Sequence, residues 1–166
     1  MWIDTTDGQQ FIQELSKEIV VEVAPEELDL FDELVAEYFR NPAPPDLSAR
    51  PKDDPLGFGL GEVLIAVTPA AAAMVKEVVN YLMTESMKAA KEESAEVIEK
   101  KVKSLFNPKK KDEKPTKKND KEVRQLNKEQ LEQVKKLARR QAIKFGISED
   151  KAEKMANALV GSLALS

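Results

Sequence analysis

The feature that most constrains the fold is the segment from Val63 to Val75, which is almost entirely apolar and contains no charged side chain. Its length suits a buried helix better than a membrane span, and Lys76 and Glu77 follow it directly. We therefore interpret it first as a core helix around which other helices pack. Two alternatives stay open: an interface between copies of the chain, or a segment that enters a membrane conditionally. The candidate residues for these alternatives are Phe58, Leu60, Val63, Leu64, Ile65 and Val67.

A long helix is predicted to start within this segment. Thr68 and Pro69 are typical of a helix start, with threonine as the N-cap and proline at the first position. The helix is predicted to run from about residue 69 to about residue 106, or to break near Ser86 or Ser94, because few globular helices are so long. Apolar residues at steps of three and four predict a weak coiled-coil-like seam, which docks on the rest of the chain or dimerises. The seam positions are Met83, Met87, Ala90, Ser94, Val97, Ile98, Val102 and Leu105.

Composition favours helix-on-helix packing and narrows the possible chemistry. Aromatic residues make up 5% of the chain, so a core must be built mainly from aliphatic side chains, as in helical proteins. Cysteine and histidine are both absent. The sequence therefore offers no disulfide, no thiolate or imidazole metal ligand and no histidine base. We expect no cofactor, no metal site and no enzymatic activity.

Two helices are predicted in the amino-terminal part. The first runs from Gly8 to Val23 with Asp7 as its cap, although the β-branched residues 19–23 also suit a short strand. The second starts at Pro25, has acidic residues in its first turn and continues to Arg40. The predicted core residues of this body are Phe11, Leu15, Leu28, Phe31, Leu34, Val35, Phe39, Leu64, Val67, Val75, Val79 and Leu82.

The chain is predicted to divide into three parts. Residues 1–106 form an acidic helical body that includes a proline-rich connector at 41–55. Residues 107–124 are rich in lysine and poor in apolar side chains, which predicts a disordered basic linker. Residues 125–166 are predicted to form a helical hairpin that docks on the body or self-associates. The predicted fold class is therefore all-α, with one long helix, a disordered lysine-rich linker and a carboxy-terminal hairpin.

The hairpin has clear helix-start and helix-end signals. Asn127 and Ser148 are suitable N-caps, and Gly146 suits the left-handed position after a helix end. The predicted inward-facing residues of its two helices are Leu131, Val134, Leu137, Ala138, Ala142, Ile143, Ala152, Met155, Ala156, Leu159, Val160 and Leu163.

Charge is divided unevenly along the chain. Residues 1–106 carry a net charge of -11, whereas residues 107–166 carry +7. A basic carboxy-terminal part suggests contact with the acidic body, self-association or an anionic partner. The basic segment lacks aromatic residues for base stacking, which makes nucleic acid the least favoured partner. The candidate interaction residues are Lys109, Lys110, Lys111, Lys117, Lys118, Lys135, Lys136, Arg139 and Arg140.

These patterns predict a cytoplasmic, non-enzymatic interaction or adaptor protein that docks a protein partner or self-associates. One alternative is a conditional membrane-perturbing protein that uses residues 56–83 against an anionic membrane surface. A second alternative is a weak nucleic-acid-binding accessory protein that uses the basic carboxy-terminal part.

Overall fold

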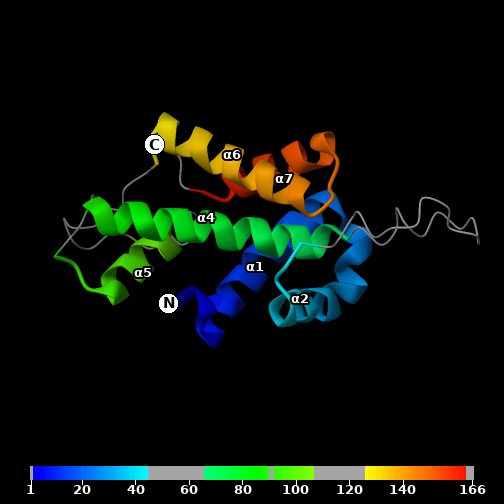
Figure 1. The fold of residues 1–166 in the computed structure, drawn as a ribbon, viewed down its shortest axis with the longest axis horizontal. Helices are drawn as coiled ribbons and strands as arrows, with labels where there is room; N and C mark the ends of the chain where they lie inside the picture. The colour runs from blue at the N-terminus through cyan, green and yellow to red at the C-terminus, as the bar shows by residue number, and fades with distance from the viewer. Residues whose placement is uncertain (1, 45–65, 90–91, 107–125, 164–166) are drawn as a thin grey trace, which may run out of the picture.

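The computed structural model describes residues 2–44, 66–89, 92–106 and 126–163. Helices make up nearly all of these residues, so the predicted all-α fold class is confirmed for them (Figure 1). The elements are the 3-10 helices η1 (Trp2–Asp4) and η2 (Pro25–Leu30) and the α-helices α1 (Thr6–Val23), α2 (Phe31–Arg40), α4 (Val67–Ala89), α5 (Ala95–Leu105), α6 (Lys128–Lys144) and α7 (Glu149–Gly161).

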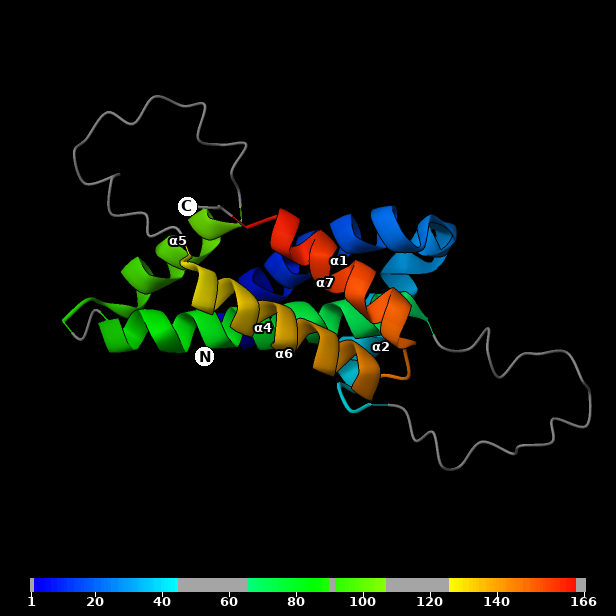
Figure 2. The ribbon, with the colours of Figure 1, turned by 90° about the horizontal axis from the view of Figure 1, so that it is seen from above.

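The helix α4 lies at the centre of the molecule and contacts α1, α2, α5 and α6 (Figure 1 and Figure 2). Apart from Pro69, its residues 67–75 are all buried, including the four alanines at 70–73 and Met74. Small side chains let the surrounding helices approach the α4 backbone closely. In the described part of the apolar segment, residues 66–75, the core-helix interpretation is therefore confirmed, and Val67 is only 1% exposed.

The N-cap residue of α1 differs from the predicted one. Thr5, not Asp7, is the N-cap, because its side-chain oxygen accepts a hydrogen bond from the Gly8 backbone N–H at 3.2 Å. Asp7 instead lies in the first turn. The strand alternative for residues 19–23 is wrong, because α1 continues as a helix to Val23 and its residues Ile19 and Val20 are buried.

The single helix predicted from Pro25 to Arg40 is wrong in one respect: η2 and α2 replace it. Leu30, the last residue of η2, is the N-cap of α2 and departs from α-helical geometry with φ -108° and ψ 3°, and it is 52% exposed. Most of the predicted body core is confirmed as buried, whereas Leu28, Leu34 and Phe39 are only partly buried. Leu64 lies outside the described residues. The confirmed positions are Phe11, Leu15, Phe31, Val35, Val67, Val75, Val79 and Leu82.

A side chain that is distant in sequence accepts hydrogen bonds from the first backbone N–H groups of α4. Glu27 of η2 accepts hydrogen bonds from the backbone N–H groups of Val67 and Thr68, at 2.8 and 2.9 Å, and from the Thr68 hydroxyl at 2.8 Å. The prediction that Thr68 caps this helix is wrong, since Thr68 is already inside it. The Glu27 carboxylate accepts hydrogen bonds from N–H groups that have no partner within the helix. Its negative charge also complements the positive end of the helix dipole.

The long predicted helix breaks before Ser94, as one alternative allowed. α4 runs through Ser86 to Ala89, and α5 begins after Ser94, whose side chain accepts a hydrogen bond from the Val97 N–H. α5 then packs back on α4 (Figure 1). In the seam, Met87 and Val97 are 38% and 40% exposed, whereas Met83, Ile98, Val102 and Leu105 are buried.

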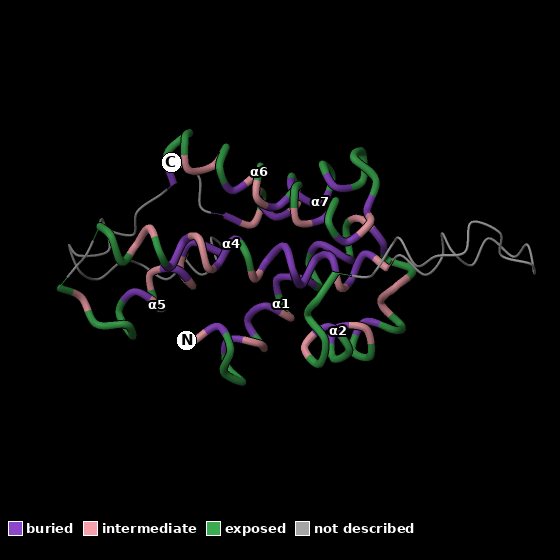
Figure 3. Tube along the Cα trace, in the orientation of Figure 1, coloured by how far each residue is buried: buried purple, intermediate pink, exposed green. Residues whose placement is uncertain are grey.

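The carboxy-terminal hairpin forms as predicted and docks on α4 and α1. Asn127 and Ser148 cap α6 and α7, and Gly146 adopts a φ of 89° in the turn between them. Buried residues of the hairpin and of the amino-terminal helices belong to one continuous apolar cluster (Figure 3). The predicted inward position of Ile143 is wrong, because its side chain is 40% exposed.

Parts of the predicted organisation lie outside the described residues. These are residues 45–55 of the proline-rich connector and the whole of the lysine-rich linker at 107–124. The division of the chain into a body, a linker and a hairpin module stays a prediction.

Candidate interaction surfaces

Some cations of the predicted basic surface form ion pairs with acidic residues of α7, whereas others do not. On α6, Lys135 lies 3.6 Å from Glu153, and Arg139 lies 3.9 Å from Glu149. These two cations therefore face their own hairpin partner, and their charges are partly neutralised. Five other cations of the predicted surface lie outside the described residues: Lys109, Lys110, Lys111, Lys117 and Lys118.

The cations that point away from the hairpin form a row along α6. Lys136, Arg140 and Lys144 are four residues apart and all exposed, so they share one helix face; we call them the basic row. None of them forms an ion pair with another described residue. Ile143 lies beside this row and is 40% exposed. Sequence reasoning included Lys136 and Arg140, missed Lys144 and placed Ile143 on the inward face. The spacing of four residues could have indicated Lys144.

A groove of about 670 Å³ lies between α1 and α7. Val21 and Ala158 contribute apolar surface, and Val21 is 51% exposed. Gly161 borders the groove where a Cβ atom would meet nothing within 4 Å, so the space above it is open. The lining residues are Glu14, Lys17, Glu18, Val21, Glu22, Phe106, Asn157, Ala158, Gly161 and Ser162.

The α1 side of this groove carries a row of carboxylates. Glu14, Glu18 and Glu22 are four residues apart and all exposed; we call them the acidic row. Like charges at this spacing disfavour a helix slightly, so local helix stability does not explain the pattern. Sequence reasoning missed this row, although the same spacing could have indicated it.

Little positive charge offsets the acidic row within the described chain. The cation in the groove lining, Lys17, has its Nζ 5.9 Å from the centre of the Phe31 ring. The Ser162 hydroxyl donates a hydrogen bond to Glu18 at 3.1 Å, and Glu14 and Glu22 form no ion pair with other described residues. Moreover, α7 ends beside the groove with no basic residue in its last turn, so its helix dipole adds negative potential.

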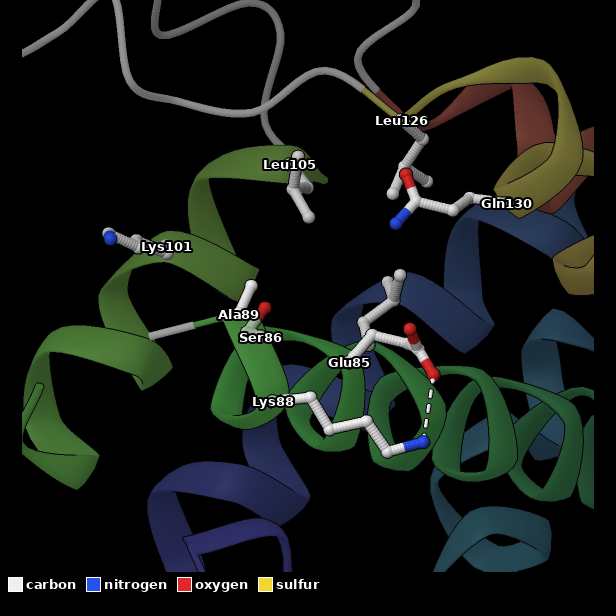
Figure 4. Close-up of a pocket in the computed structure, with 9 residues that line it drawn as sticks. Glu85, Ser86, Lys88, Ala89, Lys101, Leu105, Leu126 and Gln130 are labelled. Carbon is white, nitrogen blue, oxygen red and sulfur yellow. Dashed lines mark hydrogen bonds and ion pairs between the residues drawn. The ribbon is translucent and has the colours of Figure 1, made fainter. Parts of the chain in front are cut away.

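A second, smaller groove of about 260 Å³ lies where α4, α5 and the start of α6 meet (Figure 4). Leu105, Leu126 and Gln130 point toward it. Two lysines of its lining are already paired, Lys88 with Glu85 at 3.5 Å and Lys101 with Glu93 at 2.6 Å. The groove therefore presents apolar surface with little net charge. Its lining residues are Leu82, Glu85, Ser86, Lys88, Ala89, Lys101, Leu105, Leu126 and Gln130.

A polar and aromatic cluster joins η1, α1 and α5. Asp7 accepts hydrogen bonds from the Trp2 indole N–H at 2.9 Å and from Lys103 at 2.8 Å. Hydrogen bonds from Lys103 and Trp2 lower the pKa of Asp7, and the hydrogen bond to Asp7 raises the pKa of Lys103. Phe11 packs between the rings of Trp2 and Phe106, with centroid distances of 5.5 and 5.7 Å. This cluster holds α5 against α1.

The candidate membrane or oligomer segment is described only at Val67, which is buried; Phe58, Leu60, Val63, Leu64 and Ile65 lie outside the described residues. Among the described helices, none has the length and apolar character needed to cross a membrane. The described side chains also contain no group of three or more acidic residues arranged to hold a metal ion.

Comparison of the chain with protein-family models, with curated proteins and with solved structures found no match.

Proposed function

We propose that this protein is a non-enzymatic helical interaction protein whose docking site is the groove between α1 and α7. The observation that carries the proposal is the combination of an apolar floor, an open space above Gly161 and an acidic row along one edge. An amphipathic helix with basic residues beside its apolar face has the complementary shape and charge.

The size of the groove supports this kind of ligand. At about 670 Å³ it lies within the range of pockets that bind ligands in proteins. Its apolar contribution comes from Val21 and Ala158, while the carboxylates lie at the edge, where they act on orientation and association rate more than on affinity. We therefore expect modest affinity with a marked preference for cationic partners.

A synthetic amphipathic helix with leucine on one face and lysine on the other serves as the probe. Titrated into isotopically labelled protein, it should shift backbone amide resonances of α1 and α7 around the groove. The Gly161→Leu variant should bind it at least about tenfold more weakly, because a Cβ atom at this position meets nothing within 4 Å and the larger side chain occupies the open space. Circular dichroism should show that this variant keeps its helical content, since leucine is a better helix former than glycine.

The matched control is the same probe with glutamate in place of lysine. It should bind far more weakly than the lysine probe, because its charges repel the acidic row. Equal binding of both probes, or shifts spread away from α1 and α7, contradicts the proposal. The membrane and nucleic-acid alternatives stay predictions, since the residues on which they mainly rest lie outside the described ranges.

A further inference from the structure

The acidic row on α1 and the basic row on α6 have the same spacing and opposite charge. Each row has three charged residues at intervals of four, and each extends about 12 Å along its helix axis. An exposed β-branched residue precedes the last charge in both: Val21 on α1 and Ile143 on α6. When one helix face packs on the other, the charges can pair, and the two apolar side chains lie at the edges of the contact.

The remaining cation of each face already has a partner within the same molecule. On α1, Lys17 lies over the Phe31 ring, and on α6 Arg139 lies beside Glu149. Both residues stand three positions after the first charge of their row. Glu132 is also exposed and precedes the basic row by four residues, so the α6 face is basic only from Lys136 onward. The three carboxylates of the acidic row and the three cations of the basic row form no ion pair with other described residues, which leaves an attraction that the described chain does not satisfy internally.

One molecule cannot bring its own two rows together. The helix α6 packs on α4 and α7, and α7 in turn lies between α6 and α1 (Figure 2). Val134, Ala138 and Ala142 face this interior and are completely buried, so the basic row lies on the outer side of α6. Because α1 and α6 belong to the same packed core, contact between the rows requires two molecules.

We propose that the partner bound along the α1/α7 groove is the outer, basic face of α6 of a second copy of this chain, whose acidic counterpart is the groove edge rather than its apolar floor. This inference rests on the proposed function, to which it adds the identity of the partner. The basic row of one copy pairs with the acidic row of the next, with Ile143 and Val21 at the edges of the contact. Since the two surfaces differ, the contact is head-to-tail and each copy keeps one groove and one α6 face for further copies. The assembly therefore closes into a ring or continues as a chain.

The strength of this contact should depend on salt. Exposed ion pairs contribute little individually and are screened as ionic strength rises. We expect concentration-dependent self-association, measured by sedimentation velocity, that weakens at least about tenfold between about 50 mM and about 500 mM NaCl.

The first variant reverses the outer charges of the acidic row with Glu14→Lys and Glu22→Lys. Glu18 is retained because it accepts the hydrogen bond from Ser162. The new lysines lie four residues from Glu18 on either side, an arrangement that favours the helix, so this variant should fold. It should lose self-association, since its groove edge now repels the basic row.

The second variant reverses the outer charges of the basic row with Lys136→Glu and Lys144→Glu, and retains Arg140. It should also lose self-association. The decisive variant combines all four substitutions in one chain. Its groove edge reads positive, negative, positive and its α6 face reads negative, positive, negative, so self-association should return.

The matched control introduces two lysines elsewhere, with Glu33→Lys and Glu96→Lys. Both residues are exposed, lie outside the groove and form no ion pair with other described residues. This control should associate like the original chain. Circular dichroism of every variant checks that the fold is retained.

Three outcomes overturn the inference. The first is a chain that stays monomeric up to about 1 mM while the lysine probe still binds the groove; the proposed function then survives without this partner. The second is self-association that neither row variant weakens. The third is loss of association in both row variants without recovery in the combined one. If the lysine probe also fails to bind, the proposed function fails as well.

Discussion

At the scale of single residues, Gly8 allows η1 to fold back against the first turn of α1. A Cβ atom at this position would lie 2.7 Å from Ile3 Cα and closer still to the Trp2 carbonyl oxygen. Both neighbours are backbone, so neither can move without displacing η1. Gly8 is also helical, with no positive φ, which means that space rather than conformation requires glycine here.

We predict that Gly8→Ala lowers the free energy of unfolding by about 1–3 kcal/mol, the usual cost of overpacking. Urea denaturation followed by circular dichroism measures it. Gly161→Ala is the matched control, because the added methyl group meets nothing and improves helix propensity; it should be neutral or stabilise by up to about 1 kcal/mol. Equal stability of the two variants contradicts the packing explanation.

The hydrogen bonds of Asp7 lead us to predict that acid loosens the structure locally. Its pKa in the folded protein is lowered from 3.8, first by the hydrogen bond from Lys103 and then by that from Trp2. A lowered folded-state pKa means that its contribution is fully present above the unfolded value and is lost as pH falls through the folded value. Below about pH 4, therefore, α5 should loosen from η1 and α1.

The fluorescence of Trp2, the chain's single tryptophan, reports this change directly. As pH falls below 3.8, its emission should shift before global unfolding is seen by circular dichroism. In Asp7→Asn this step should disappear, because the side chain no longer titrates. An unchanged acid step in that variant would assign the transition to other carboxylates.

At the scale of elements, α4 depends on a residue forty positions away for its start. Glu27 accepts three hydrogen bonds from Val67 and Thr68 and thereby links η2 to the central helix. The α4 sequence has no acidic residue in its own first turn, so this carboxylate supplies the negative charge that a helix start favours.

We predict that Glu27→Ala costs about 2 kcal/mol in unfolding free energy, because two backbone N–H groups and a hydroxyl lose a charged acceptor. Thr68→Val should cost less, since it removes one of the three hydrogen bonds. Hydrogen exchange provides the specific measurement: amides at the start of α4 should exchange faster in Glu27→Ala while those of α7 stay protected. If amide exchange became faster to the same extent in all helices, the substitution would act on global stability rather than on the start of α4.

At the scale of the whole molecule, Tyr38 joins α2 to the carboxy-terminal hairpin. Its ring lies 6.1 Å from that of Phe145, at the end of α6, and 5.5 Å from that of Phe39. Burial, with a smaller contribution from Glu77, raises the pKa of Tyr38 to about 12. Ionisation would place a charge in the contact between two parts of the chain that are distant in sequence.

A raised folded-state pKa means that the stabilising contribution is complete below the ordinary value of 10 and is lost as pH rises through about 12. We predict that unfolding free energy falls over this range more steeply in the original chain than in Tyr38→Phe. The difference between the two urea denaturation series removes the effect of lysine titration, which both share. Parallel curves would contradict a role for Tyr38 ionisation.

Much of the secondary structure could be predicted from the sequence, because its signals are local. Asn127, Ser148 and Gly146 predicted the hairpin through short-range capping and backbone preferences, and the structure confirms all three. The same reasoning failed at Thr68, where a distant acceptor competes with the local cap. It also failed at Ile143, since the apolar periodicity of a helix does not show where its contact surface ends.

The sequence by itself determined the all-α class, the helical hairpin and the burial of residues 67–75, because propensity, capping and apolar periodicity act over a few residues. Only the tertiary structure decided which helices contact α4, that Glu27 caps it and that α7 lies beside α1. Those contacts depend on how several helix surfaces fit together, and many pairings satisfy the same apolar pattern. The candidate groove belongs to this second class, since it exists only where α1 meets α7.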